Sequence, residues 1–398
     1  MATDPVESIQ SEERQTPFSS NLQRRVRDLA HLEPSRTHQY LSAYIDWRPE
    51  GENPGVRPGK ITLEHQLSKL RRDLHDAGAD TREVEANAQK IIELVEDGID
   101  PAVHGIFVLA CDASNVFETV YMAIPMDTDV AIGPTPKLRQ LAATIEDHPR
   151  FAVLHADQHD ASLFVVNRAS PQSELSMESN EYPRKQHQGG WSQRRFQARQ
   201  DERLHHFAKA VAEEVRRVLS EEEISMLVLS VGEVFGSALN EEWHSSVKSM
   251  VVGEISHGPA DTESEIIEKA QKVAEQAERN NAAENIKTFE DAVGSGNQGA
   301  AGPDDVLMAL ESGQVMTLLM ASDFEATGWA DFELGLYGTG DIPAEHPAGG
   351  DVENLTRIDL AEEFVRLGLS TGAEVEIVAS RTAASLHKHG GVGAILRY

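Results

Sequence analysis

The sequence predicts an α/β protein built from more than one domain. Its 398 residues exceed the roughly 150 residues of an average domain. Apolar residues recur at every second position in some segments and at helical spacing in others, and the two patterns alternate along the chain. A glycine-rich stretch at residues 292–303 interrupts this alternation and resembles a linker or loop between two domains. With 40% hydrophobic residues, each domain has enough apolar side chains for an ordinary core.

The first predicted domain covers residues 1–104 and is a variable α/β domain. Its first 20 or so residues are polar, so we expect them to be disordered. Residues 40–47 (YLSAYIDW) form the one apolar strand pattern in this part. Apolar residues at helical spacing from 63 to 95, broken near residues 78–80, predict two helices.

The second predicted domain covers residues 105–290. Two runs with apolar residues at alternate positions, GIFVLACD and VFETVYMAI, predict adjacent strands joined by a turn. Residues 151–156 and 161–167 predict a hairpin, and residues 226–231 a buried strand. A long helix is expected from Gln193 to Leu219, and a strongly charged one from Asp261 to Thr288.

The third predicted domain covers residues 291–398. Helices are expected at residues 304–312 and 358–369. Strands are expected at residues 315–320, 374–379 and 393–397. Short strands alternating with helices predict a small α/β sandwich.

Charge and cysteine content limit the classes of function. The formal charge of −30 is unfavourable for non-specific binding of nucleic acid, which depends on Lys and Arg. A single cysteine, Cys111, excludes an intrachain disulfide and a zinc site made of cysteines. The sequence has neither an apolar run of about 18 residues nor a signal-peptide pattern at its start. A cytoplasmic protein without a membrane span is therefore expected.

One stretch reverses the acidic character of the chain. Its basic residues are Arg184, Lys185, Arg194, Arg195, Arg199 and Arg203. Only Asp201 and Glu202 oppose them. A helix would align residues 195, 199 and 203 in one row, because they are spaced by four. Such a row suits an RNA backbone, since each guanidinium presents a planar set of donors to phosphate. A row of arginines is also common on an ordinary solvated helix face.

The glycines and glutamine before this row are the candidate catalytic residues. Gly189 and Gly190 permit backbone conformations that other residues avoid, which allows close approach to a ligand. Gln193 is expected at the start of the helix, where free backbone N–H groups can receive negative charge. The alternative interpretation of a Gly-Gly pair before a helix is a flexible loop.

Two stretches of sequence resemble one known family. QGGWSQRRFQARQDE resembles the catalytic-loop region of the bacterial and archaeal release-factor-like family. That family is related to archaeal and eukaryotic class I release factors, Pelota and the ribosome-quality-control peptidyl-tRNA hydrolases. GAAGPDDVLMALESGQVMTLLM and the terminal GGVGAILRY resemble the third domain of the release factors. The resemblance covers roughly residues 105–398.

The resemblance implies a fold and a set of partners. The central domain would be RNase H-like, with a loop that enters the peptidyl transferase centre. The C-terminal domain would be an α/β sandwich like domain 3 of the release factors. The implied partners are the ribosome with its RNA and A site, peptidyl-tRNA, and a translational GTPase such as elongation factor Tu. The resemblance implies no cofactor and no metal ion.

Two departures from the family pattern leave two hypotheses open. Trp191 and Ser192 separate Gly190 from Gln193, so the motif is GGWSQ and not the GGQ of class I release factors. Residues 1–104 contain no NIKS-like motif, so stop-codon recognition is not expected. The first hypothesis is a peptidyl-tRNA hydrolase for ribosome rescue or quality control, in which Gln193 orients water. The alternative is a non-catalytic hibernation factor that occupies the A site.

Histidines elsewhere suggest weaker candidates. His155, Asp157 and His159 would share one face of a strand, as metal ligands do, but Asp157–Asp160 is also typical of a hairpin turn. We expect the turn and no metal site. His205 and His206 are expected on the surface of the long helix, and Cys111 in an apolar strand as a buried thiol.

Overall fold

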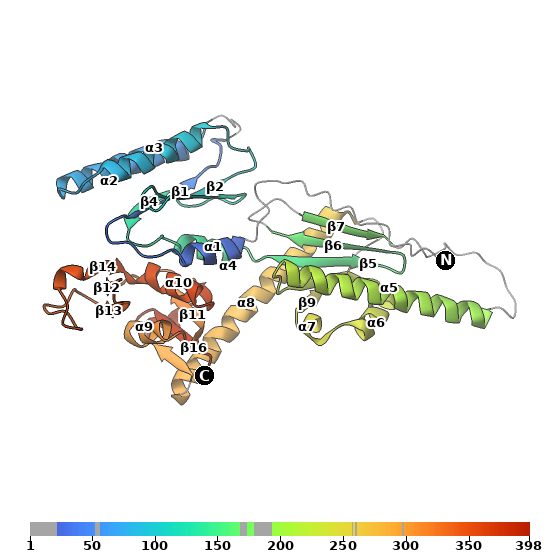
Figure 1. The fold of residues 1–398 in the computed structure, drawn as a ribbon. Helices are drawn as coiled ribbons and strands as arrows, with labels where there is room; N and C mark the ends of the chain where they lie inside the picture. Colours follow the sequence, from blue (N-terminus) through green and yellow to red (C-terminus); the bar gives the residue numbers. More distant parts are fainter. Residues whose placement is uncertain are drawn as a thin grey trace, which may run out of the picture. The chain divides into compact units, whose positions relative to one another are not determined.

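The chain is a mixed α/β protein with more than one compact unit. The computed structural model describes residues 22–51, 56–167, 173–178, 193–256, 258, 261–296 and 298–398, without the side chains of residues 173–178 and 193–201. The central unit comprises Pro149–Glu278. The two-segment unit combines Leu22–His148 with Arg279–Tyr398. Figure 1 shows the order of helices and strands along the chain.

The central unit is organised around one five-stranded sheet. Its strands are β5 (Phe151–Ala156), β6 (Asp160–Val166), β7 (Ser173–Glu178), β8 (Leu227–Val231) and β9 (Val251–Glu254). They lie in the order β7-β6-β5-β8-β9. The pairs β5–β6 and β6–β7 are antiparallel, whereas β5–β8 and β8–β9 are parallel. The predicted hairpin at residues 151–167 is therefore confirmed.

Helices cover both faces of this sheet. They are α5 (Gln193–Glu221), α6 (Glu233–Glu242), α7 (Ser245–Lys248) and α8 (Glu263–Ser295). Alternate residues of β5 face opposite sides, so Leu154 packs with Leu204 of α5 and Phe235 of α6. Val153 packs with Ile266 of α8 on the other face. The sheet is thereby buried between helices, and α5 lies along it (Figure 1).

The N-terminal segment of the two-segment unit is a four-stranded antiparallel sheet with four helices. The strands are β1 (Tyr40–Asp46), β2 (Gly105–Cys111), β3 (Val116–Met122) and β4 (Asp129–Gly133), in the order β3-β2-β1-β4. The helices are α1 (Leu22–Ala30), α2 (Pro58–Asp76), α3 (Arg82–Glu96) and α4 (Arg139–Asp147). The two helices expected between residues 63 and 95 are confirmed as α2 and α3.

This sheet corrects one predicted domain boundary. The boundary between residues 104 and 105 separates β1 from β2, yet these strands pair along their whole length. Residues 105–148 therefore belong with the N-terminal sheet, and the central unit begins at Pro149. Alternation of apolar residues identifies a strand but does not say which other strand it pairs with.

The C-terminal segment contains two small sheets. The first has the order β10-β16-β11-β15 and the second β13-β12-β14. The strands are β10 (Gly299–Ala301), β11 (Val315–Ala321), β12 (Thr327–Asp331), β13 (Leu336–Thr339), β14 (Thr356–Asp359), β15 (Glu374–Val378) and β16 (Val392–Leu396). The helices are α9 (Pro303–Glu311), η1 (Val352–Asn354), α10 (Leu360–Ser370) and α11 (Ala384–His387).

The glycine-rich stretch at residues 292–303 contains regular secondary structure and is not only an interdomain linker. Its first residues complete α8, and Gly299–Ala301 forms β10, which pairs with β16. A side chain at Gly299 would lie 2.8 Å from the backbone nitrogen of Val293. Glycine is therefore required there for a close backbone approach. The predicted boundary at residues 290 and 291 falls inside α8.

Charged side chains join the two segments of this unit. The Glu362 carboxylate on α10 accepts hydrogen bonds from the backbone N–H groups of Leu138 at 2.7 Å and Arg139 at 2.9 Å. These N–H groups lie at the start of α4, where a helix leaves donors unpaired. Lys137 pairs with Asp359 at 2.9 Å. The start of α4 is therefore capped from a helix more than 200 residues away in the sequence.

Candidate functional site

Helix α5 begins at Gln193, as the sequence predicts. The first N–H groups of an α-helix have no partner within the helix, and the helix dipole adds partial positive charge there. A glutamine at this position therefore lies beside donors that can stabilise negative charge on a reacting oxygen. The side chain of Gln193 is not among those that the structure describes.

The predicted site residues divide into three groups. Gly189, Gly190, Arg184 and Lys185 lie outside the described residues. For Arg194, Arg195 and Arg199 the structure describes the backbone, which is helical. Arg203 is described with its side chain and is exposed. Residues 195, 199 and 203 lie on one regular helix, so their spacing of four places them in one row.

The exposed side of α5 carries further cations beyond the residues that the sequence analysis singled out. On α5, Leu204, Ala208, Val211 and Val215 face the core. The opposite, exposed side carries Arg203, His206, Lys209 and Arg216, together with the acidic residues Glu202 and Glu213. The side chains of Arg203, Lys209 and Arg216 form no hydrogen bond or ion pair with any described residue. These three cations are therefore accessible to an external anion, although Lys209 and Arg216 lie 6 and 13 residues after Arg203 and do not follow the spacing of four.

A neighbouring arginine is placed differently. Arg217 is held by the carboxylates of Glu214 and Glu221, three residues before and four residues after it. Its hydrogen bond with Glu214 raises the pKa of Arg217 and lowers the pKa of Glu214. Because two carboxylates of the same helix neutralise this arginine, we expect it to contribute little to the binding of an anionic ligand.

The two helix histidines differ in surroundings. His205 Nδ1 lies 3.8 Å from Glu242 and 3.9 Å from Glu241, both on α6. This arrangement links α5 to α6. His206 is exposed, as expected, and lies between Arg203 and Lys209 on the basic row.

The three possible metal ligands at the end of β5 have other partners, and Asp157 closes a turn. Asp157 Oδ1 accepts the backbone N–H groups of His159 at 2.6 Å and Asp160 at 2.9 Å, which closes the β5–β6 hairpin. His155 Nδ1 lies 3.2 Å from Ser230 Oγ on β8. In the described part of the chain, no three His, Cys, Asp or Glu side chains are grouped to hold a metal ion.

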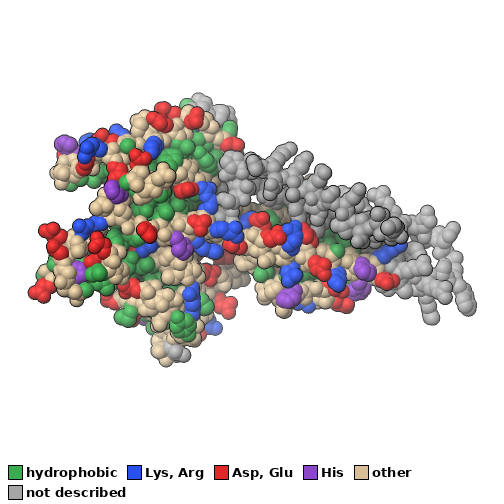
Figure 2. Space-filling model, in the orientation of Figure 1, with side chains coloured by type: hydrophobic (Ala, Val, Ile, Leu, Met, Phe, Trp, Pro, Cys, Tyr) green, Lys and Arg blue, Asp and Glu red, His purple; other side chains and the backbone are tan. Residues whose placement is uncertain are grey.

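Acidic side chains dominate the surface outside this row. On the face drawn in Figure 2, Asp and Glu are distributed over the described residues, with Lys and Arg between them. Phosphate would be repelled by most of such a surface, so the free cations of α5 are the part best suited to it. Within the described residues, no helix is both long and apolar enough to cross a membrane.

Comparison with known proteins identifies the relatives of this sequence. Residues 136–275 match the family described as bacterial archaeo-eukaryotic release factor family 10. Peptide chain release factor subunit 1 of Archaeoglobus fulgidus is 27% identical over 244 residues, which cover 56% of this chain and 60% of that protein. The chain is thus similar to release-factor-like proteins. The matched residues include the whole stretch from Arg184 to Arg203.

Other comparisons extend beyond the archaea. Eukaryotic peptide chain release factor subunit 1 of Podospora anserina is 24% identical over 281 residues, covering 65% of this chain and 64% of that protein. This chain thus spans about three fifths of the length of these relatives. The structure of Dom34 from S. cerevisiae, described as a translation termination-like factor, aligns with a TM-score of 0.39 and 13% identity. That alignment covers 74% of this chain and 79% of Dom34.

Proposed function

We propose that this protein is a ribosome-associated peptidyl-tRNA hydrolase that acts in ribosome rescue or quality control and does not read stop codons. The observation that carries the proposal is the position of Gln193. It is the first residue of α5, within the region that matches the release-factor family. Gln193 would orient the water that attacks the ester, and the free N–H groups of the helix start would stabilise the developing oxyanion.

The basic row on α5 supplies the contacts with RNA in this proposal. Arg194, Arg195, Arg199 and Arg203 would hold tRNA or ribosomal RNA near the A site and the peptidyl transferase centre. Lys209 and Arg216 would extend the contact along the same helix. For Arg184 and Lys185 we propose contacts with RNA, and for Gly189 and Gly190 the catalytic role predicted from the sequence.

The observed sheets support the finer fold assignments that we propose. A five-stranded mixed sheet covered by helices on both faces fits an RNase H-like central domain. A small four-stranded sheet with helices fits a C-terminal domain like domain 3 of the release factors. That domain would dock a translational GTPase such as elongation factor Tu, and the protein would work in the cytoplasm.

The test compares hydrolysis with binding. Peptidyl-tRNA release is measured on stalled ribosomes, and co-sedimentation with ribosomes is measured in parallel. Gln193→Ala is expected to abolish release and to leave co-sedimentation unchanged. Gln200→Ala is the matched control, because it removes the same side chain almost two turns further along α5. Loss of release in both variants, or in neither, would contradict the role of Gln193.

One feature favours a second function. Trp191 and Ser192 lengthen the motif to GGWSQ, so the distance along the chain from the glycine pair to the glutamine differs from GGQ. A longer loop would displace Gln193 from the position that hydrolysis needs. The protein would then be a hibernation factor that occupies the A site without cleaving peptidyl-tRNA. Co-sedimentation of wild-type protein without any release would establish this alternative.

A further inference from the structure

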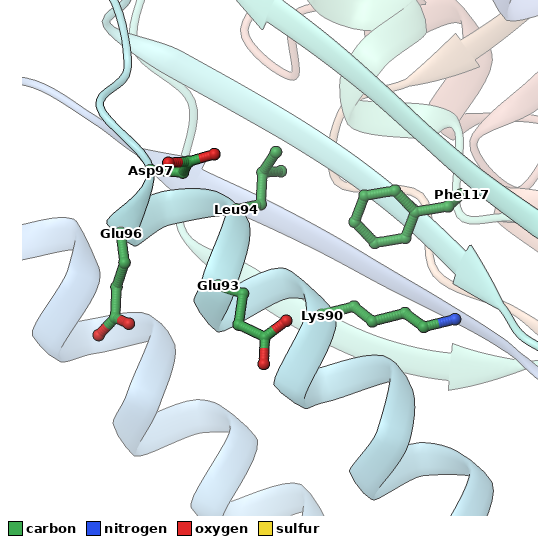
Figure 3. Close-up of a pocket in the computed structure, with 6 residues that line it drawn as sticks. All are labelled: Lys90, Glu93, Leu94, Glu96, Asp97 and Phe117. Atoms are coloured by element: carbon green, nitrogen blue, oxygen red, sulfur yellow. The ribbon is translucent and has the colours of Figure 1, made fainter.

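A surface hollow lies between α3 and β3 in the N-terminal segment of the two-segment unit. It has a volume of about 520 Å³ and opens to solvent. Six residues line it (Figure 3): Lys90, Glu93, Leu94, Glu96, Asp97 and Phe117. None of them belongs to the loop or to the helix face discussed above. We call this feature the α3–β3 hollow.

An aromatic ring forms one wall of the hollow. Phe117 on the edge strand β3 is 39% exposed, so its ring is accessible to a ligand. The residue that pairs with it on β2 is Ala110, whose methyl group is too small to cover the ring. Leu94 lies opposite on α3, so the wall and floor between these two residues are apolar (Figure 3).

The charges around the ring are unevenly neutralised. Glu96 is paired with Lys60 of α2 at 3.0 Å, and the ammonium of Lys90 is held by Asp112 at 2.5 Å. Glu93 accepts a hydrogen bond from the uncharged Gln89 amide at 3.0 Å. The side chain of Asp97 has no hydrogen bond or ion pair with any described residue. Glu93 and Asp97 are thus carboxylates without a cationic partner beside an accessible aromatic ring.

We propose that the α3–β3 hollow docks an arginine side chain from an extended, arginine-rich protein segment. A guanidinium stacks on an aromatic face and pairs with a carboxylate through a planar set of donors. Phe117 supplies the face, and Asp97 and Glu93 supply the carboxylates. Lysine fits less well because its ammonium is a strongly hydrated point charge without a planar surface. Nucleic acid is repelled by the acidic rim.

Peptide binding to the full-length chain tests this proposal without ribosomes. The probe is a fluorescent arginine–glycine repeat peptide, compared with a lysine–glycine peptide of the same length. Physiological salt screens the general attraction of a −30 protein for any cationic peptide. Phe117→Ser and Asp97→Asn are each expected to weaken binding about fivefold. The lysine–glycine peptide should bind wild type less tightly than the arginine–glycine peptide.

Two control variants separate this site from bulk charge and from misfolding. Asp341→Asn removes the same charge as Asp97→Asn, but from a carboxylate outside the hollow that pairs with Arg357, so it should leave affinity unchanged. Phe117→Tyr keeps the ring and should bind like wild type. Equal affinity in all variants, or equal losses in Asp341→Asn and Asp97→Asn, would overturn the proposal. Self-association that is lost in Phe117→Ser would also overturn it, because a second copy would then fill the hollow.

Discussion

Helix α5 and the junction between α4 and α10 use charged side chains in opposite ways. On α5, Arg203, Lys209 and Arg216 are exposed and have no partner among the described residues. At the junction, Glu362 accepts two backbone N–H groups, and the buried Arg366 pairs with Glu363 and donates to the carbonyl of Ala30. The charged groups at the junction therefore already have partners within the protein and stabilise the fold. The cations on α5 are available to bind a ligand.

The difference between the exposed cations of α5 and the paired charges at the junction is informative because acidic residues strongly outnumber basic residues in this chain. The chain has 66 acidic and 36 basic residues, so most cations have a nearby carboxylate to pair with. A helix face that keeps several cations without a partner among the described residues is a feature that an anionic ligand would explain. Total charge alone argues against binding RNA, and its local distribution argues for it.

The largest expected effect comes from breaking the buried pair at the junction. Arg366→Met leaves the Glu363 carboxylate, which is 1% exposed, without its cation. Isolating a buried charge in this way should lower the free energy of unfolding by about 3–5 kcal/mol. Urea unfolding measures the change. Arg357→Met, which breaks an exposed pair with Asp341, should have little effect, and equal losses would refute the contrast.

A smaller effect is expected from removing the cap of α4. Glu362→Ala deletes the acceptor for two N–H groups and should lower the free energy of unfolding by about 1–2 kcal/mol. Glu362→Gln keeps an acceptor oxygen and should restore most of this loss. Thermal unfolding of both variants beside wild type provides the measurement. A loss in Glu362→Gln as large as in Glu362→Ala would show that the charge, not the hydrogen bonds, is what α4 needs.

The same carboxyl group predicts a pH dependence. Its desolvation raises the pKa of Glu362 above the usual 4.5. The folded state then holds the proton more tightly than the unfolded state, so the contribution of this group to stability falls as pH rises from 4.5 through the raised pKa. Glu362→Gln should flatten that part of the stability–pH curve. An unchanged slope would mean that Glu362 is solvated in the folded protein.

The smallest effect on stability is expected on α5. Lys209→Ala and Arg216→Ala remove exposed, unpaired cations and should change the free energy of unfolding by less than about 0.5 kcal/mol. Under the proposed function, each substitution instead weakens ribosome binding. It should also reduce the slope of log K against log salt concentration by about one, which corresponds to the loss of one phosphate contact. Arg217→Ala is the control, since Glu214 and Glu221 already neutralise this arginine. If wild type and the three variants show the same salt dependence of ribosome binding, Lys209 and Arg216 do not contact phosphate.

Helices and strands with strong periodicity were predictable from the sequence. The long helix expected over residues 193–219 is α5, Gln193–Glu221, because one apolar stripe runs along it. The small sheet of β12, β13 and β14 was not predicted. Its strands have only four or five residues and include Gly, Asp and Thr, so they show no clear alternation.

For the candidate site, the sequence by itself determined the motif, the local excess of arginine and the spacing that forms a row. These are properties of neighbouring residues, and helical geometry converts spacing into position. Only the tertiary structure decided that β1 pairs with β2, that Glu362 caps α4, and that Lys209 and Arg216 have no partner among the described residues. Such facts depend on contacts between residues far apart in the chain, which periodicity and composition do not specify.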